Sequence, residues 1–180
     1  MKLSRRARLI GRTFQIVARA IIGIAMMLGV VVRQANYLPD VPQAVSASRS
    51  DATRSLKGTR ITLSDVDWST QRSTVVLVLS TNCRFCTESA PFYNQLVSTA
   101  SRQSEVRLIA VFPQEIDAAK TYLKSISVSL PDVRQASFGP LGISGTPTIL
   151  LVDNTGLVTE AWVGRLGPNG EKDVLRAIGL

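Results

Sequence analysis

The sequence predicts an α/β fold in which helices pack against a mixed β-sheet, and it places one transmembrane helix before that fold. The apolar run 75–80 is too hydrophobic for a half-exposed strand and suits the centre of a sheet, and 106–112 predicts the next buried strand. Segments with helical spacing follow both runs, as crossovers between parallel strands require. The run 148–153 leads through a tight turn into 157–163, which predicts an antiparallel hairpin.

Residues 13–32 predict a transmembrane anchor. The uncharged stretch 20–32 is shorter than the roughly 20 residues that a spanning helix needs. Extension back to residue 13 reaches that length if Arg19 snorkels to the headgroups. Six basic residues precede the apolar stretch and only Arg33 follows it. The positive-inside rule therefore places residues 1–12 in the cytoplasm and the C-terminal domain outside the cell membrane, in the periplasm or another extracytoplasmic space.

A cleaved signal sequence is the alternative to this anchor. Cleavage needs small residues at the third and first positions before the cut, close to the apolar run. Arg33 fails this requirement for cleavage after Ala35, and Val45-Ser46-Ala47 lies well past the apolar run. We favour the anchor, and both interpretations predict an exported domain.

The net charge of +8 comes from the N-terminus, where seven of the 21 Lys and Arg residues precede Asp40, the first acidic residue. The remainder carries 14 basic and 13 acidic residues, a balance of +1. No basic stripe is left for a phosphate backbone, so we expect no nucleic-acid partner. The absence of histidine also removes the usual ligands of haem, copper and catalytic zinc and the general base of most hydrolases.

Residues 33–57 predict a flexible linker, because they contain Pro39, Pro42 and several serines and show no apolar period. The folded domain is then expected over residues 58–180. A short β segment at 59–63 is predicted to open it, before the first buried strand.

Helices are expected after each of the buried strands and at the C-terminus, over a segment beginning near Cys83, over 115–124, and from 169 or 170 to 178. The first of these helices contains Pro91, which should kink it. Its apolar residues at helical spacing predict an inward stripe: Phe85, Ala90, Tyr93, Leu96 and Val97.

Cys83 and Cys86 are the only cysteines of the chain, and they are separated by two residues at the turn from a strand to a helix. This spacing is typical of a redox dithiol. A disulfide closing so short a loop removes little unfolded-state entropy, so the pair would serve chemistry rather than stability. A structural zinc site needs four ligands, and the chain offers neither a third cysteine nor a histidine. We therefore expect no metal and no cofactor.

With these motifs in order, residues 58–180 resemble the thioredoxin superfamily, and the anchored, exported form resembles the TlpA-like and ResA-like thiol-disulfide oxidoreductases. The resemblance is carried by the Cys-x-x-Cys that opens a helix, by Pro91 eight residues beyond the first cysteine, and by Thr146-Pro147-Thr148 in place of a cis-proline loop. It implies a thioredoxin-like sandwich with an added N-terminal β segment. It also implies that the backbone of Thr146, beside Pro147, pairs with an extended substrate chain, with Phe85 as a further substrate contact.

The sequence departs from the family at three positions. Leu77 stands where cytoplasmic thioredoxins have a buried aspartate, and Ser89 stands where the TlpA-like group often has glutamate. Glu88 precedes that position by one residue, about 100° around a helix, so it cannot simply replace the missing side chain. The proton acceptor for Cys86 is therefore not identified. Asn82 replaces the tryptophan that precedes the first cysteine in the family.

Cys83 is expected to be the nucleophile, because a thiolate at a helix N-terminus is stabilised by free N–H groups, and Cys86 is expected to resolve the mixed disulfide. Arg84 adds a cation that should lower the pKa of Cys83 and make the reduction potential less negative than that of thioredoxin.

The predicted function is reduction of disulfides in exported proteins, with electrons from a membrane donor. A thiol oxidant or isomerase of the same fold is an alternative. A peroxiredoxin-like peroxidase is another, since Ser80 lies three residues before Cys83, and a non-catalytic metal-binding module is a third.

Overall fold

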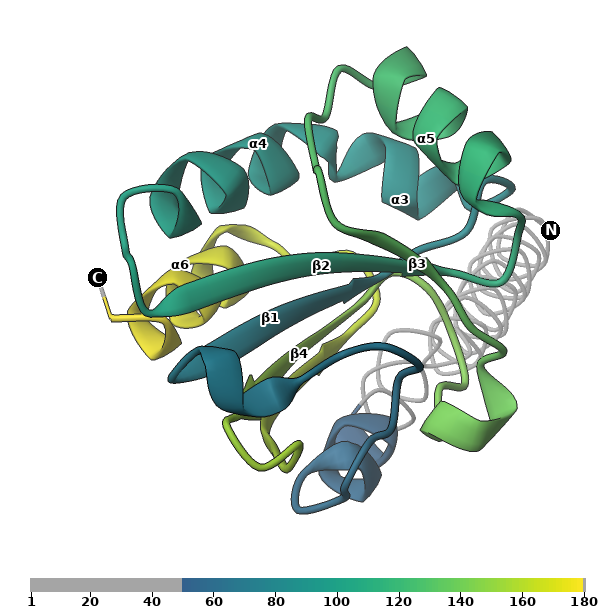
Figure 1. The fold of residues 1–180 in the computed structure, drawn as a ribbon. Coiled ribbons are helices and arrows are strands. Elements are labelled where there is room, and N and C mark those ends of the chain that lie inside the picture. The colour runs from purple at the N-terminus through teal and green to yellow at the C-terminus, as the bar shows by residue number, and fades with distance from the viewer. Residues whose placement is uncertain (1–49, 180) are drawn as a thin grey trace, which may run out of the picture. The chain divides into compact units, whose positions relative to one another are not determined.

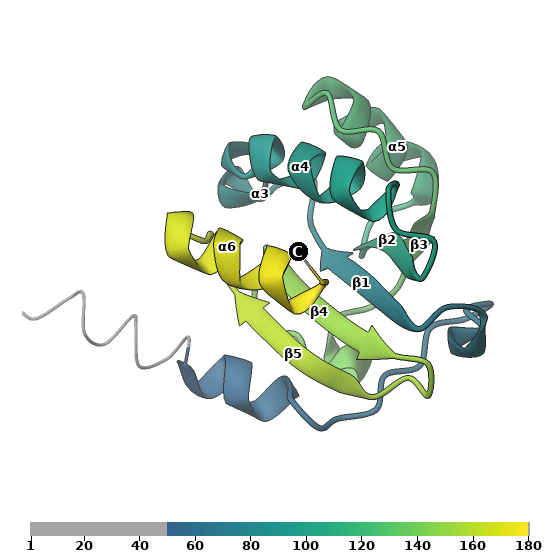
Figure 2. The same ribbon diagram turned by 90° about the vertical axis from the view of Figure 1, so that its left-hand side faces the viewer.

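The computed structural model describes residues 50–179. The predicted anchor at 13–32, the basic residues 1–12 and most of the predicted linker lie outside this range. Within it, no helix combines the length and the apolar character that crossing a membrane requires. The described elements, drawn in Figures 1 and 2, are η1 (Trp68–Thr70), β1 (Ser73–Val78), α3 (Arg84–Glu88), α4 (Ala90–Ala100), β2 (Val106–Phe112), α5 (Ile116–Ser125), β3 (Val133–Gln135), η2 (Gly139–Leu141), β4 (Thr148–Asp153), β5 (Val158–Val163) and α6 (Pro168–Ala177).

The strands form one mixed sheet in the order β3-β2-β1-β4-β5. Strand β1 is central and pairs parallel with β2, with Val75 opposite Leu108. Its other side pairs antiparallel with β4, with Val75 opposite Leu151. Strand β3 continues the parallel half and β5 the antiparallel half. The predicted mixed sheet and the predicted hairpin are confirmed.

Alternate residues of β1 enter two separate hydrophobic cores, one on each face of the sheet. Val75 and Leu77 belong to the first core, together with residues of α3, α4, α5 and α6. Val76 and Val78 belong to the second core. Figure 2 shows α4 and α6 over one face of the sheet and the helical segment 50–56 on the opposite side, near β5. Both faces of β1 are buried, as its continuous apolar sequence predicts.

The structure corrects the predicted linker boundary. Residues 50–56 are helical, and Leu56 is buried in the second core. The adjacent Lys57 donates hydrogen bonds of 2.8 Å to both carboxylate oxygens of Glu160 on β5. One buried leucine in a polar segment gives no apolar period, which is why the sequence pattern did not reveal this helix.

The predicted β segment at 59–63 is present only as an isolated antiparallel bridge between Arg60 and Leu157. Ile61 and Leu63 are nevertheless buried in the second core. Their alternating apolar pattern therefore reflects packing against the sheet and does not indicate a strand of the sheet. The sequence pattern also missed β3, because this strand has three residues and begins only two residues after Pro131.

Pro91 separates two helices instead of kinking one. Helix α3 ends at Glu88, Ser89 forms the junction, and Pro91 occupies the first turn of α4. A proline is tolerated there because the first N–H groups of a helix have no partner within it. The stripe prediction is confirmed for Ala90, Tyr93 and Leu96, which are buried.

The turn between β4 and β5 has the predicted tight geometry. Asp153 Oδ1 accepts hydrogen bonds from the amides of Thr155 (2.8 Å) and Leu157 (3.0 Å). Gly156 has a φ of +84°, and a Cβ at this position would lie 3.1 Å from the indole of Trp68. Conformation and space therefore both require glycine here. Trp68 serves as a packing residue of the second core.

Asp132 joins two strands through arginine side chains. Its Oδ2 accepts from Arg107 of β2 at 2.5 Å, and its Oδ1 accepts from Arg134 of β3 at 2.6 Å. The Asp132 side chain is only 19% exposed. Burial acts to raise the pKa of this carboxyl, but the hydrogen bonds and charges of Arg134 and Arg107 outweigh burial and lower it.

We predict that Asp132→Asn destabilises the fold by about 1–2 kcal/mol near neutral pH, between the values typical of exposed and buried pairs. Because the folded-state pKa is lowered, the carboxylate contributes fully above the unfolded-state pKa of about 3.9 and loses its contribution as the pH falls through the folded-state value. Urea unfolding at several pH values measures this. The exposed pair of Asp173 with Arg176 gives the control Asp173→Asn, for which about 0.5 kcal/mol or less is expected. A pH-independent loss for Asp132→Asn would contradict the electrostatic account.

Candidate active site

Cys83 caps the N-terminus of α3 at the end of the buried strand β1. Its side chain accepts a hydrogen bond from the amide of Cys86, with a distance of 3.1 Å from N to Sγ. Its own amide donates to the carbonyl of Ser80, also at 3.1 Å. A disulfide joins Cys83 to Cys86. The sulfur of Cys83 is therefore held beside the first N–H groups of a helix, as the sequence predicts.

The two cysteines differ in exposure. Cys83 is partly exposed, whereas Cys86 is buried in the first core. In the disulfide form Cys83 is therefore the more accessible of the two cysteines. This difference supports the roles expected for the two residues.

The loop before β4 brings Thr146 and Pro147 to the disulfide. The carbonyl oxygen of Thr146 lies 3.4 Å from Sγ of Cys83, across 63 positions of sequence. The peptide bond between Thr146 and Pro147 is cis. The carbonyl of Pro147 accepts a 2.7 Å hydrogen bond from the amide of Gly164, the residue after β5. Three chain segments thus meet at the end of the sheet where Cys83 lies.

Gln114 fixes the loop between β1 and α3. Its Nε2 donates to Oγ of Ser80 at 3.1 Å, and its Oε1 accepts from the amide of Thr81 at 3.4 Å. The sequence analysis did not identify this residue. The sequence did contain an indication of its place, because Gln114 closely follows a buried strand parallel to β1. The carboxyl ends of parallel strands meet at one edge of a sheet.

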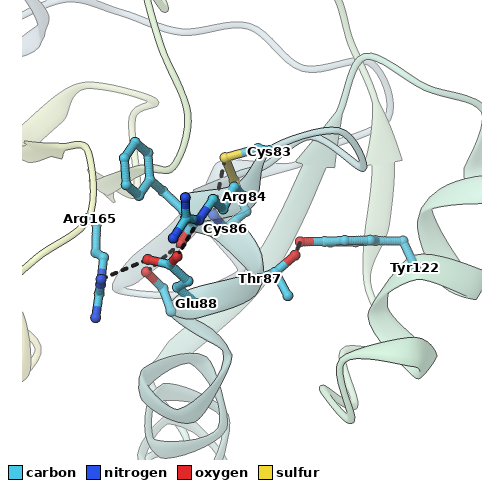
Figure 3. A network of polar contacts seen from close by, with 9 residues as sticks. Cys83, Arg84, Cys86, Thr87, Glu88, Tyr122 and Arg165 are labelled. Atoms are coloured by element: carbon cyan, nitrogen blue, oxygen red, sulfur yellow. Dashed lines mark hydrogen bonds and ion pairs between the residues drawn. A yellow bond between two sulfur atoms is a disulfide. The ribbon is translucent and has the colours of Figure 1, made fainter.

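Arg84 is paired with a carboxylate of its own helix. Its Nε donates to Oε1 of Glu88 at 2.7 Å, and Oε2 of Glu88 accepts from Nη1 of Arg165 at 2.7 Å. Figure 3 shows Glu88 between the two guanidinium groups, beside the disulfide. The Arg84 side chain is 86% exposed, that of Arg165 is 52% exposed and that of Glu88 is 26% exposed. The cation expected to act on Cys83 is therefore shared with a carboxylate.

Phe85 corrects one part of the predicted inward stripe, since it is 48% exposed. Apolar spacing alone cannot distinguish a residue that packs inward from one held at the rim of a site. Its exposure between the two cysteines agrees with the expected substrate contact. The opposite side of α3 is attached to α5, where the hydroxyls of Thr87 and Tyr122 are 3.0 Å apart (Figure 3).

The two positions at which the sequence analysis expected a carboxylate from the resemblance, 77 and 89, hold no acid. Leu77 is fully buried, and Ser89 Oγ donates to the carbonyl of Phe85 at 2.8 Å. Among residues 50–179 no aspartate or glutamate is buried. The hydroxyl of Tyr93 is buried without a hydrogen-bond partner among these residues, and burial raises its pKa.

Comparison with known proteins finds similarity at the level of the solved structures. No protein-family model matches the sequence, and no curated protein does. A structure from Chlorobium tepidum, described as a thiol:disulfide interchange protein DsbE, superposes with a TM-score of 0.54 and 19% identity, over 68% of this chain and 92% of that one. A thiol-disulfide isomerase from Corynebacterium glutamicum gives 0.51 and 18%, over 67% of this chain and 88% of that one. These likenesses show that the chain has the thioredoxin-like fold.

We predict that Gln114→Ala loosens the loop before Cys83. The loss of two hydrogen bonds should cost about 1 kcal/mol of stability and should accelerate amide hydrogen exchange at Thr81 more than within β2. Exchange followed by NMR measures both effects. The matched control is Gln135→Ala, because the hydrogen bonds of Gln135 go to Glu115 at 3.3 Å and to the carbonyl of Pro113 at 3.5 Å, not to Ser80 or Thr81. Equal protection of Thr81 in both variants would contradict the assigned role.

Proposed function

We propose that this chain is an exported, membrane-tethered thiol-disulfide oxidoreductase that reduces disulfides of exported proteins. The observation that carries the proposal is the Cys83–Cys86 disulfide at the start of a helix, with the first cysteine accessible and the second buried. The thioredoxin-like fold and the thiol-disulfide activities named for similar structures support it. The basic and apolar N-terminal sequence supports the tether.

The proposed reaction transfers two electrons in two exchange steps. The thiolate of Cys83 attacks one sulfur of the substrate disulfide, so that a mixed disulfide forms and the other substrate sulfur leaves as a thiolate, which takes up a proton. The thiolate of Cys86 then attacks Sγ of Cys83 and releases the second substrate thiol. The chain ends as the Cys83–Cys86 disulfide, which is the form that the structure describes. A membrane protein dithiol is proposed to reduce it again.

The contacts of Cys83 suit the first of these steps. The amide of Cys86 donates to its sulfur, and the exposed N-terminus of α3 favours negative charge there. The Thr146 carbonyl lies 3.4 Å from the same sulfur and belongs to backbone that an extended substrate can pair with. We propose that the exposed ring of Phe85 covers the neighbouring apolar residues of the substrate.

A thiol oxidant is the second candidate function, and one observation favours it. The amide of Cys86 donates to Sγ of Cys83, a contact that would stabilise a Cys83 thiolate and hence the reduced pair, and the adjacent Arg84 adds positive charge. Stabilisation of the reduced form makes the reduction potential less negative and the disulfide a stronger oxidant. The reduction potential of the Cys83–Cys86 pair therefore decides whether the chain reduces or oxidises its substrates.

The reduction potential of the full chain tests the proposal and separates the two candidates. We expect a value between those of thioredoxin, about −270 mV, and DsbA, about −120 mV, and nearer the former. Equilibration with glutathione and dithiothreitol buffers, followed by thiol alkylation, measures it. A value close to that of DsbA would favour the oxidant, and failure to form the intramolecular disulfide would refute the redox function.

Cys86→Ser should trap substrates as mixed disulfides, because the buried thiol that resolves them is removed. Expression of the tagged full chain followed by non-reducing gel electrophoresis should reveal adducts that disappear on reduction. Cys83→Ser/Cys86→Ser is the control, since it keeps the fold's contacts and lacks the nucleophile. Equal adduct levels in both variants would contradict the role of Cys83.

A further inference from the structure

Glu88 occupies a position at the candidate site that the proposed exchange reaction does not use. It accepts from Arg84 through one carboxylate oxygen and from Arg165 through the other, each at 2.7 Å (Figure 3). Arg84 immediately follows Cys83, whereas Arg165 lies in the segment after β5. The next residue back along that segment, Gly164, bonds the carbonyl of Pro147. Glu88 thus lies between two cations at the rim of the disulfide.

We propose that Glu88 sets the reduction potential of the Cys83–Cys86 pair by holding the guanidinium of Arg84, and that Arg165 regulates how strongly it does so. This inference rests on the proposed thiol-disulfide function. Glu88 acts through Arg84, so it is a positioning residue and takes no direct part in the exchange.

The physical basis is competition between two anions for one guanidinium. In the disulfide form Cys83 carries no charge, and Arg84 pairs with Glu88. Reduction creates a thiolate on the residue next to Arg84, and the guanidinium then has two possible partners. The ion pair between Arg84 and Glu88 must weaken before the guanidinium can stabilise the thiolate. A stronger ion pair therefore leaves the thiolate less stabilised. The carboxylate therefore favours the disulfide form and makes the potential more negative.

Arg165 modifies this competition because a carboxylate shared between two cations holds each of them less strongly than it holds one alone. Removal of Arg165 leaves Glu88 with Arg84 as its remaining partner in the described contacts. The guanidinium of Arg84 would then be held more firmly, and one positive charge would be lost from the rim. Both effects disfavour the thiolate.

Substitutions of Glu88 and Arg165 should consequently shift the potential in opposite directions. Glu88→Gln should lower the equilibrium constant for oxidation by glutathione disulfide about tenfold, which corresponds to a potential about 30 mV less negative. Arg165→Gln should raise that constant severalfold. A role of Glu88 limited to joining α3 to the segment after β5 would be lost equally in both variants, and both shifts would then have the same sign.

A double-mutant cycle that combines substitutions of Glu88 and Arg84 tests whether Glu88 acts through Arg84. Arg84→Gln should raise the equilibrium constant, and Glu88→Gln should have a smaller effect in the Arg84→Gln background than in the original chain. Equal effects in both backgrounds would mean that Glu88 acts by its own charge alone, and they would overturn the proposal.

The matched control is Glu105→Gln, which removes the same charge from an ion pair of 3.5 Å with Arg72. These residues precede β2 and β1, at the end of the sheet opposite Cys83. Potentials are measured on the full chain, with circular dichroism to verify folding. A shift for Glu105→Gln as large as that for Glu88→Gln would overturn the proposal.

If the potential is measurable but unaffected by Glu88→Gln, only this inference fails, whereas absence of a reversible Cys83–Cys86 disulfide refutes the proposed function itself.

Discussion

The double burial of β1 is the constraint on which the rest of the structure depends. Its residues Val75 to Val78 and the following Leu79 are almost completely inaccessible to solvent, and they alternate between two cores. Burial of each such side chain contributes about 1.5–3 kcal/mol. Strand β1 also has hydrogen-bonded neighbours on both sides. Cys83 follows this strand after a loop held by Gln114, so its sulfur is positioned by the most firmly packed part of the domain.

The candidate site is assembled from loops that share one end of the sheet. Gln114 follows β2, Thr146 precedes the antiparallel β4, and Arg165 follows β5, which runs parallel to β1. In this mixed sheet the C-terminal ends of β2 and β5 and the N-terminal end of β4 therefore lie at the same edge. The contacts of these three residues with the α3 region explain why the chemistry of a local motif depends on distant sequence.

The sequence predicted elements that depend on local pattern and missed those that depend on contacts. The strand at 106–112 was predicted with its observed bounds, because its run is apolar except for Arg107 and is too short for a buried helix. Phe85 has the spacing of a core residue and lies at the surface, because helical periodicity does not specify where the neighbouring elements end. The pairing of Glu88 with Arg165 joins residues 77 positions apart. Without the fold, nothing in either residue's local sequence indicates the other.

The antiparallel border of the sheet is poorly suited to accept another strand. Within the described residues, β5 is the outermost strand on that side. The register of its pairing with β4 shifts between Leu151 and Val152. Arg60 forms an isolated antiparallel bridge with Leu157, the residue before β5. The ion pair of Lys57 with Glu160 adds charge along the same strand. Irregular pairing and charge are devices that prevent edge-to-edge aggregation. For the proposed reduction of protein disulfides, such protection would leave the backbone near Thr146, rather than the edge of β5, as the place where an extended substrate pairs.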